Sequence, residues 1–207
     1  PAGRHTQAPV SERAGRWFGS FFDKEEREPP VNDGEIIGVD VGISRLATIS
    51  DGTIIENPRH LKNRERKLKR LQKEVSRKTK GSNNRRKAVE RLAKQHKRVV
   101  DARMDFIHKA TTMLARTKSV IGVESLNIAG MMRNPSLAGS IADTGMGTFL
   151  RQLAYKAQWY GSRVVEADQW FASTQLCSEC HAHNETPLEQ RIYICTKCGL
   201  VLDRDLN

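Results

Sequence analysis

Short runs in which apolar residues alternate with polar or small ones predict a set of β-strands. The first run covers residues 35–41 and continues through residues 46–49 and 53–55, which predicts a three-stranded meander. Two later runs, at residues 119–126 and 162–168, have the same alternation. They predict two more strands, each preceded by a helical segment.

Helical spacing of apolar residues fills most of the chain between these strands. Over residues 59–118 this spacing is broken only by turn-forming residues at 80–84, which predicts two long helices in an antiparallel hairpin. A further helix is expected over residues 147–160. Residues 127–142 are rich in Gly, Ser, Asn and Met, and this composition predicts a flexible loop.

Aromatic residues and methionines near these segments have two possible roles. Exposed aromatic side chains can stack on nucleic-acid bases, but aromatic residues beside a strand more often belong to the core. We therefore expect a core position for Trp159, Tyr160, Trp170 and Phe171. Met131 and Met132 are expected to make packing contacts rather than to bind a metal.

In each of two predicted strands, one carboxylate lies two residues after a glycine. Asp40 lies in the first predicted strand and Glu124 in the fourth. A meander, then helix and strand, then helix and strand again, is the order of elements in an α/β RNase H-like fold, in which these two strands are neighbours. One acid at a strand end is more often a solvated residue, so the prediction depends on both acids occurring in this order.

A third acid would complete a metal-binding cluster. The run Asp203-Arg204-Asp205 supplies two candidates. Three carboxylates can hold two Mg²⁺ or Mn²⁺ ions about 3.5–4 Å apart, which is the arrangement used to hydrolyse phosphodiesters.

Four cysteines occur as two Cys-x-x-Cys pairs separated by an apolar strand: Cys177, Cys180, Cys195 and Cys198. This spacing predicts a tetrahedral, structural Zn²⁺ site that folds a segment too small to form its own core. Two disulfides are the alternative, but the chain shows no secretory signal. His181 and His183 are expected to be exposed loop residues.

The formal net charge is +11 and the sequence pI is about 9.8, which indicates a polyanionic partner. Lysine and arginine outnumber acids in the predicted hairpin, where they are either a solvated charged face or a nucleic-acid contact. We expect nucleic-acid contact through Lys62, Arg66, Lys69, Arg70, Lys73, Arg77, Lys78, Arg85 and Arg86. No apolar run is long enough to cross a bilayer, so no membrane partner is expected.

Motifs at residues 38–42, 123–126, 173–180 and 195–207 resemble the RuvC and zinc-ribbon motifs of the TnpB (OrfB) proteins of insertion sequences, which are related to type V CRISPR effectors. Residues 16–21 resemble the last strand of that family's wedge domain. The chain departs from the family pattern at His181, where glycine is usual, and at Thr174 and Gln175, where Ser-Lys is common.

The resemblance implies an RNA-guided DNA endonuclease that cuts through Asp40, Glu124 and Asp205, with Asp203 as the alternative third ligand. Its expected cofactors are structural Zn²⁺ and catalytic Mg²⁺ or Mn²⁺, and its expected partners are a guide RNA derived from the transposon end and a target DNA. A prokaryotic, cytoplasmic and nucleoid-associated location would follow.

The same resemblance suggests a division of the chain. Residues 1–33 would be the end of the wedge domain or an N-terminal tail, and residues 34–172 a RuvC nuclease domain with a helical insertion at about 59–118. The zinc ribbon would span residues 173–200, and residues 201–207 would begin the last RuvC motif. The family's N-terminal recognition domain and final helix are not in the sequence, so we expect a fragment.

Other functions are compatible with parts of this pattern. A nuclease-inactive or truncated relative would be an RNA-guided DNA-binding protein that acts like a repressor, although such proteins usually lack a catalytic acid. A structure-specific RuvC-like nuclease that needs no guide would not need the ribbon or the basic insertion. A DDE-type transposase shares the fold and the metal chemistry but also joins strands. The oligomeric state is left open.

Overall fold

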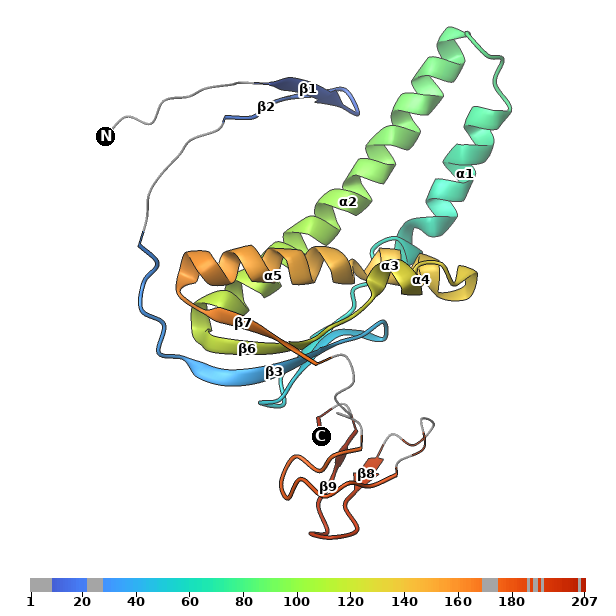
Figure 1. Cartoon of the computed structure of the whole chain (residues 1–207). Helices are drawn as coiled ribbons and strands as arrows, with labels where there is room; N and C mark the ends of the chain where they lie inside the picture. The colour runs from blue at the N-terminus through green and yellow to red at the C-terminus, as the bar shows by residue number, and fades with distance from the viewer. Residues whose placement is uncertain are drawn as a thin grey trace. The chain divides into compact units, whose positions relative to one another are not determined.

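The computed structural model describes residues 9–21, 28–168, 175–185, 187, 190, 192–204 and 206–207 (Figure 1). The chain divides into two compact units. One is built from described residues within 1–29 and 59–107, and the other from described residues within 30–58 and 108–207.

The second unit contains a five-stranded mixed sheet with the order β5-β4-β3-β6-β7 (Figure 1). Its strands are β3 (Glu35–Val41), β4 (Arg45–Ile49), β5 (Ile54–Glu56), β6 (Lys118–Glu124) and β7 (Arg163–Ala167). The first three strands are antiparallel neighbours, and β6 and β7 run parallel to β3. The predicted meander is confirmed, as is the prediction that the strands containing Asp40 and Glu124 are neighbours.

One face of the central strands is buried. Ile37 and Val39 of β3 and Ile121 of β6 are each less than 5% exposed, and α5 (Met146–Tyr160) lies along this face (Figure 1). The alternate positions point the other way, where exposure varies: Ile36 is 75% exposed, whereas Thr48 of β4, opposite Asp40, is 4% exposed. Asp40 and Glu124 belong to this second set of positions and are half-buried.

A buried lysine fastens α5 to the C-terminal turns of α2 (Asn83–Thr117). The Lys156 ammonium donates hydrogen bonds to the carbonyl oxygen of His108 and to the hydroxyls of Thr111 and Thr112, each at 2.8 Å. Burial lowers the pKa of Lys156. The three acceptors match the three N–H donors of the ammonium, so the buried charge is fully hydrogen-bonded.

The predicted helical hairpin is confirmed. It consists of α1 (Glu65–Ser76), which follows the short helix η1 (Lys62–Arg64), and the N-terminal part of α2. The Arg91 guanidinium bonds Glu74 at 2.6 Å and ties the two helices together. Arg85 has a structural contact as well, because its Nη1 donates to the Val75 and Lys78 carbonyl oxygens at the end of α1. A two-stranded hairpin of β1 (Val10–Arg13) and β2 (Arg16–Gly19) belongs to the same unit.

The prediction of a flexible loop at residues 127–142 is wrong. This segment contains α3 (Ile128–Met131) and α4 (Pro135–Thr144). Each helix begins at an asparagine cap: the Asn127 side chain accepts from the Gly130 N–H, and Asn134 accepts from the Ser136 N–H. These caps satisfy backbone donors that water would otherwise have to hydrogen-bond.

The prediction of a core position is wrong for Trp159, which is 62% exposed. Its neighbour Tyr160 is half-buried, with the Arg116 guanidinium 5.8 Å from its ring centre. Trp170 and Phe171 lie outside the described residues. Met132 is 40% exposed, and Met131 is half-buried. None of the described helices is long and apolar enough to cross a membrane.

An ion-pair cluster joins the starts of β3 and β6 to the turn after β4. The Lys118 ammonium bonds Glu35 at 2.8 Å and Asp51 at 2.9 Å. The bond from Lys118, together with the Thr53 N–H, lowers the pKa of Asp51 from 3.8 to about 2. A carboxyl with a lowered pKa stabilises the fold above its unfolded pKa, and this contribution is lost as the pH falls toward the folded value.

We therefore expect Asp51→Asn to lower the free energy of unfolding at neutral pH. The difference from the parent should shrink between pH 3.8 and about 2, as Asp51 becomes protonated. Urea unfolding at a series of pH values measures this, with the exposed Asp33→Asn as control. A difference that stays constant across this pH range would contradict the assignment.

Candidate metal centres and nucleic-acid interface

The register of the sheet places two acids side by side. In the parallel pair of β3 and β6, Val39 lies opposite Val123. Asp40 and Glu124 are the next residues, at the C-terminal ends of adjacent strands about 4.8 Å apart. Both are half-buried. The predicted pair is therefore brought together by backbone hydrogen bonding alone.

Two glycines precede this pair on the same face of the sheet, where Gly38 lies opposite Gly122. The Ser50 side chain lies over Gly38, whose N–H donates to the Ser50 hydroxyl at 2.9 Å. Paired carboxylates supply the oxygen ligands that Mg²⁺ and Mn²⁺ prefer.

The third acid of the predicted cluster is not gathered with this pair by the described residues. Asp203 ends β9 (Val201–Asp203), where it lies opposite Ile192 of β8 (Ile192–Ile194). Asp205 lies outside the described residues. Over the described ranges, the one group of three or more Cys, His, Asp or Glu side chains close enough to share a metal ion is formed by the cysteines.

The four predicted cysteines converge on one point. Their sulfur atoms all lie within 4.8 Å of one another, and the pairs Cys177–Cys198 and Cys180–Cys195 are 3.6 Å apart. None of these four cysteines forms a disulfide. A tetrahedron with Zn–S bonds of about 2.3 Å has sulfur–sulfur edges of about 3.8 Å, so this donor set fits a Zn²⁺ ion.

The two cysteines of the second Cys-x-x-Cys knuckle differ in charge preference. Backbone hydrogen bonds favour the charged form of Cys195. A backbone hydrogen bond from Leu200 acts on Cys198 in the same sense, but burial and the neighbouring sulfurs raise the pKa of Cys198 to about 12. The Cys198 N–H donates to the Cys195 sulfur at 3.5 Å. Backbone donors of this kind lower the pKa of Cys195 to about 6. His181 and His183 are exposed, as predicted.

The two knuckles have matching backbone geometry. In the second, the Gly199 N–H donates to the Cys195 carbonyl, and Gly199 has φ of +76°. In the first, the His181 N–H donates to the Cys177 carbonyl, and His181 has φ of +54°. A residue other than glycine is strained in this left-handed region. The family's usual glycine at this position thus has a geometric reason.

Asn207 is fastened to the first knuckle. Its carboxamide accepts hydrogen bonds from the Ser178 N–H at 3.1 Å and the Ser178 hydroxyl at 3.2 Å. It also donates to the Leu176 carbonyl at 2.7 Å. The Asn207 N–H reaches back to the Asp203 carbonyl at 3.2 Å. Asn207 is therefore held by the residues that flank Cys177.

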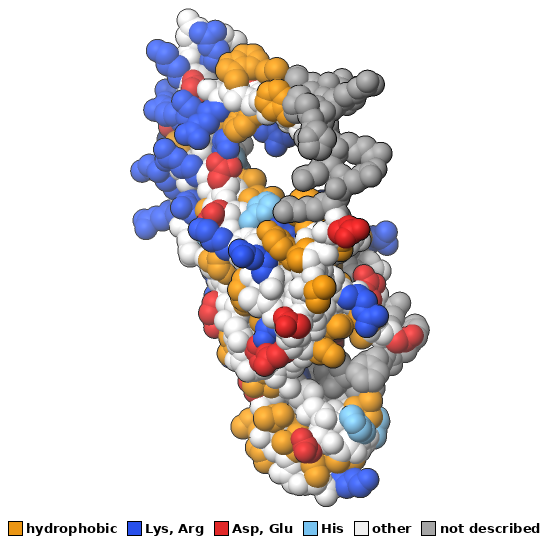
Figure 2. All heavy atoms as spheres, turned by 90° about the vertical axis from the view of Figure 1, so that its left-hand side faces the viewer, with side chains coloured by type: hydrophobic (Ala, Val, Ile, Leu, Met, Phe, Trp, Pro, Cys, Tyr) orange, Lys and Arg blue, Asp and Glu red, His pale blue; other side chains and the backbone are white. Residues whose placement is uncertain are grey.

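Positive side chains gather on the helical hairpin (Figure 2). They surround a cavity of about 910 Å³ between α1 and α2. Its lining, here called the basic groove, consists of Arg66, Lys69, Arg70, Leu71, Lys73, Glu74, Arg77, Lys78 and Arg91. Seven of these nine residues are cationic and one is acidic, so the groove has a strong excess of positive charge.

The basic groove contains most of the residues predicted to contact nucleic acid. Six of the nine predicted residues line it: Arg66, Lys69, Arg70, Lys73, Arg77 and Lys78. The other three, Lys62, Arg85 and Arg86, are not part of its lining. The excess of lysine and arginine over acids in the sequence thus pointed to most of the groove lining, and nucleic-acid contact by these residues stays a prediction.

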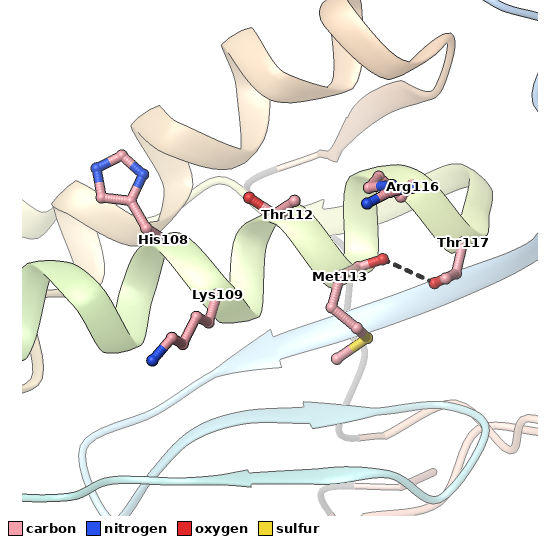
Figure 3. Close-up of a pocket in the computed structure, with 6 residues that line it drawn as sticks. All are labelled: His108, Lys109, Thr112, Met113, Arg116 and Thr117. Carbon is pink, nitrogen blue, oxygen red and sulfur yellow. Dashed lines mark hydrogen bonds between the residues drawn. The ribbon is translucent and has the colours of Figure 1, made fainter.

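Sequence reasoning missed a second hollow, of about 620 Å³, on the last turns of α2 (Figure 3). It is lined by His108, Lys109, Thr112, Met113, Arg116 and Thr117. The Thr117 hydroxyl is already bonded to the Met113 carbonyl at 2.8 Å (Figure 3). All the lining residues come from one helix, and no acid or thiol is among them. The hollow adds positive charge to this unit but no catalytic group.

Comparisons with known proteins agree with these features. Residues 21–135 match the OrfB_IS605 family model, described as "Probable transposase", and residues 147–207 match the model "Cas12f1-like, TNB domain". A "Putative RNA-guided DNA endonuclease" of Streptomyces pristinaespiralis is 39% identical over 95% of this chain and 49% of its own length. A "Putative RNA-guided DNA endonuclease InsQ" of Escherichia coli strain K12 is 33% identical over 96% of this chain and 53% of its own length.

The fold is also similar to that of a solved protein. The chain matches the Cas12f1 protein in a cryo-EM structure of the Cas12f1-sgRNA-target DNA complex, with a TM-score of 0.54 and 16% identity. The match covers 96% of this chain and 53% of that one. At this identity, the likeness concerns the fold.

A mixed sheet, a four-cysteine cluster and these matches define a protein related to the transposon-encoded effectors. The chain belongs to the TnpB (OrfB) family of insertion sequences. It spans about half the length of the curated relatives that it matches.

The strained knuckle gives a direct test of the cysteine cluster. We expect His181→Gly to relieve the left-handed strain and to stabilise the metal-bound ribbon by up to about 1 kcal/mol, or about fivefold in metal affinity. Competition titration with a zinc chelator measures this affinity. The exposed His183→Gly is the control, because His183 is not among the residues with positive φ. Weaker zinc binding by His181→Gly would contradict this explanation.

Proposed function

We propose that this chain is the nuclease part of an RNA-guided DNA endonuclease, with an RNase H-like (RuvC) domain and a zinc ribbon. The observation that supports it most strongly is the register that sets Asp40 beside Glu124 at the C-terminal ends of β3 and β6. The sheet order and the names of the relatives point the same way.

In this proposal Asp40 and Glu124 hold catalytic Mg²⁺ or Mn²⁺, and Asp205 or its alternative Asp203 supplies the third carboxylate. When bound, such ions activate water and neutralise charge on the leaving oxygen of a phosphodiester. The chain's own contribution is geometric: the ladder of hydrogen bonds between β3 and β6 fixes the spacing of the two carboxylates. The DNA strand would reach the pair from the face on which Asp40 and Glu124 lie.

The basic groove holds the nucleic-acid backbone in this proposal. Base pairing with a guide RNA derived from the transposon end reads the target DNA, so the protein needs only phosphate contacts along the heteroduplex. Its side chains suit that task because they are cationic and mostly exposed. A cytoplasmic, nucleoid-associated location follows from such partners.

The zinc ribbon has a structural task. All four thiolates are ligands, which leaves no open coordination position for catalysis. The Asn207 contacts extend the effect of the metal to the segment after β9. The ribbon thus supports the part of the chain in which the third carboxylate lies.

Substitution of the paired acids tests the nuclease. With Mg²⁺, target DNA and transposon-end RNA, we expect Asp40→Asn and Glu124→Gln each to slow cleavage about 10²–10³-fold or more, because each removes a metal ligand. DNA and RNA affinity should be unchanged. The exposed Asp33→Asn is the control. Cleavage by Asp40→Asn at the parent rate would contradict the proposal, and RNA-dependent DNA binding without cleavage by the parent would favour a repressor-like protein.

Removal of charge from the basic groove tests its binding of nucleic acid. We expect Lys69, Arg70 and Lys73, all replaced by Gln, to weaken RNA–DNA duplex binding and to reduce the slope of log K against log salt by about 0.7–0.9 for each phosphate that is no longer neutralised. The measurement is fluorescence anisotropy at several salt concentrations. A control that removes the same charge from Arg151, Arg163 and Lys197, which are exposed elsewhere, should keep most of the slope. Equal effects in both variants would show that net charge alone governs binding.

A further inference from the structure

Asn184, a polar residue of the ribbon, has a buried side chain. Asn184 is 6% exposed and lies between the first knuckle and the strand that leads to the second. It packs beside Tyr193 and Cys195, which are 0% and 2% exposed. Burying a carboxamide is costly unless its donors and acceptor are all hydrogen-bonded.

The Asn184 carboxamide meets this condition and has one possible orientation. Its oxygen accepts from the Thr196 N–H at 2.9 Å and from the Thr196 hydroxyl at 2.7 Å. Because a backbone N–H can only donate, the oxygen must face Thr196. The amide nitrogen therefore faces the opposite side, where it contacts the Tyr193 hydroxyl at 2.7 Å and the Ala182 carbonyl at 3.1 Å.

The same nitrogen lies 3.6 Å from the sulfur of Cys195, so its two N–H groups serve three acceptors and one N–H is shared with the sulfur. Among the described residues, Cys195 is the one cysteine that accepts a hydrogen bond from a side-chain amide. A thiolate that binds a metal is negatively charged and accepts hydrogen bonds. An N–H donor to its sulfur lowers the reactivity of the thiolate and fixes the orientation of the sulfur lone pairs.

We propose that Asn184 is a positioning residue of the metal cluster, which holds the Cys195 thiolate through an N–H···S hydrogen bond and links the two knuckles through Thr196. This inference depends on the proposed zinc site. It goes beyond that site by assigning a function to a residue outside the four ligands. Its contacts explain why an asparagine, with a donor and an acceptor on one short side chain, occupies this position.

The test compares the full chain with Asn184→Asp, which has nearly the same shape but no N–H donor. Gln190→Glu is the matched control, because it makes the same amide-to-carboxylate change at an exposed position of the ribbon. Co²⁺ titration followed by its sulfur-to-metal absorption, with Zn²⁺ competition, gives the metal affinity. Alkylation by iodoacetamide, followed by peptide mass spectrometry, gives the reactivity of each cysteine separately.

We expect the parent and Gln190→Glu to bind one ion with the same affinity. Asn184→Asp should bind it about 10–100-fold more weakly. In the metal-loaded protein, Cys195 should be alkylated faster in Asn184→Asp than in the parent, by a larger factor than Cys177. The substitution also removes the bonds to Tyr193 and Ala182, but among the four sulfurs only that of Cys195 loses a hydrogen bond. General loosening of the ribbon would not produce this selectivity.

Parent-like affinity and Cys195 reactivity in Asn184→Asp would overturn the inference, and so would equal acceleration at all four cysteines. If Asn184→Asp takes up no metal, Asn184→Ser is tested in its place, because its smaller side chain adds no charge. Faster alkylation of Cys195 than of the other cysteines in Asn184→Ser supports the inference. Alkylation and metal affinity like those of the parent overturn it. Failure of the parent to bind Co²⁺ or Zn²⁺ would instead refute the zinc site, which keeps the two failures distinct.

Discussion

The parallel pairing of β3 with β6 is the constraint on which the rest of this structure depends. Parallel neighbours cannot be joined by a tight turn, so the chain must cross over between them. Here the crossover includes α1 and the long helix α2. The same pairing sets Gly38 opposite Gly122 and puts Asp40 and Glu124 at one edge of the sheet. A slip of one residue in this register would move one of the two acids to the buried face.

The alternation in β3 and β6 was sufficient to predict both faces of the sheet, because a strand with one buried face has a strict period of two. The Cys-x-x-Cys spacing was equally informative, since two such pairs in a segment with little hydrophobic core are typical of a zinc site. The third carboxylate could not be assigned in this way. Asp203 and Asp205 are two residues apart in a strand-to-turn segment, where periodicity does not decide direction.

The errors have physical explanations. The loop predicted at residues 127–142 was based on composition. Two helix-capping signals in this segment pointed to helices instead: Asn127, and Asn134 followed by Pro135. Trp159 lies near the end of α5, whose buried face includes Leu153 and Ala157. Because Trp159 is two residues beyond Ala157, it is turned about 200° around the helix and lies on the opposite face. Arg85 is a different case, because its predicted nucleic-acid contact stays a prediction. Its charge is visible in sequence, but its bonds to the end of α1 depend on how the hairpin closes.

The attachment of Asn207 to the residues around Cys177 has a consequence for the order in which the protein is made. Asp40 and Glu124 leave the ribosome before the ribbon does, and their strands can pair before it exists. The segment after Asp203 is synthesised only after all four cysteines, and its anchor is a knuckle that a metal ion shapes. Under the proposed function, a growing or metal-starved chain would already have two acids in register but no fixed third one. Assembly of the proposed cutting centre would then be a late event of biosynthesis.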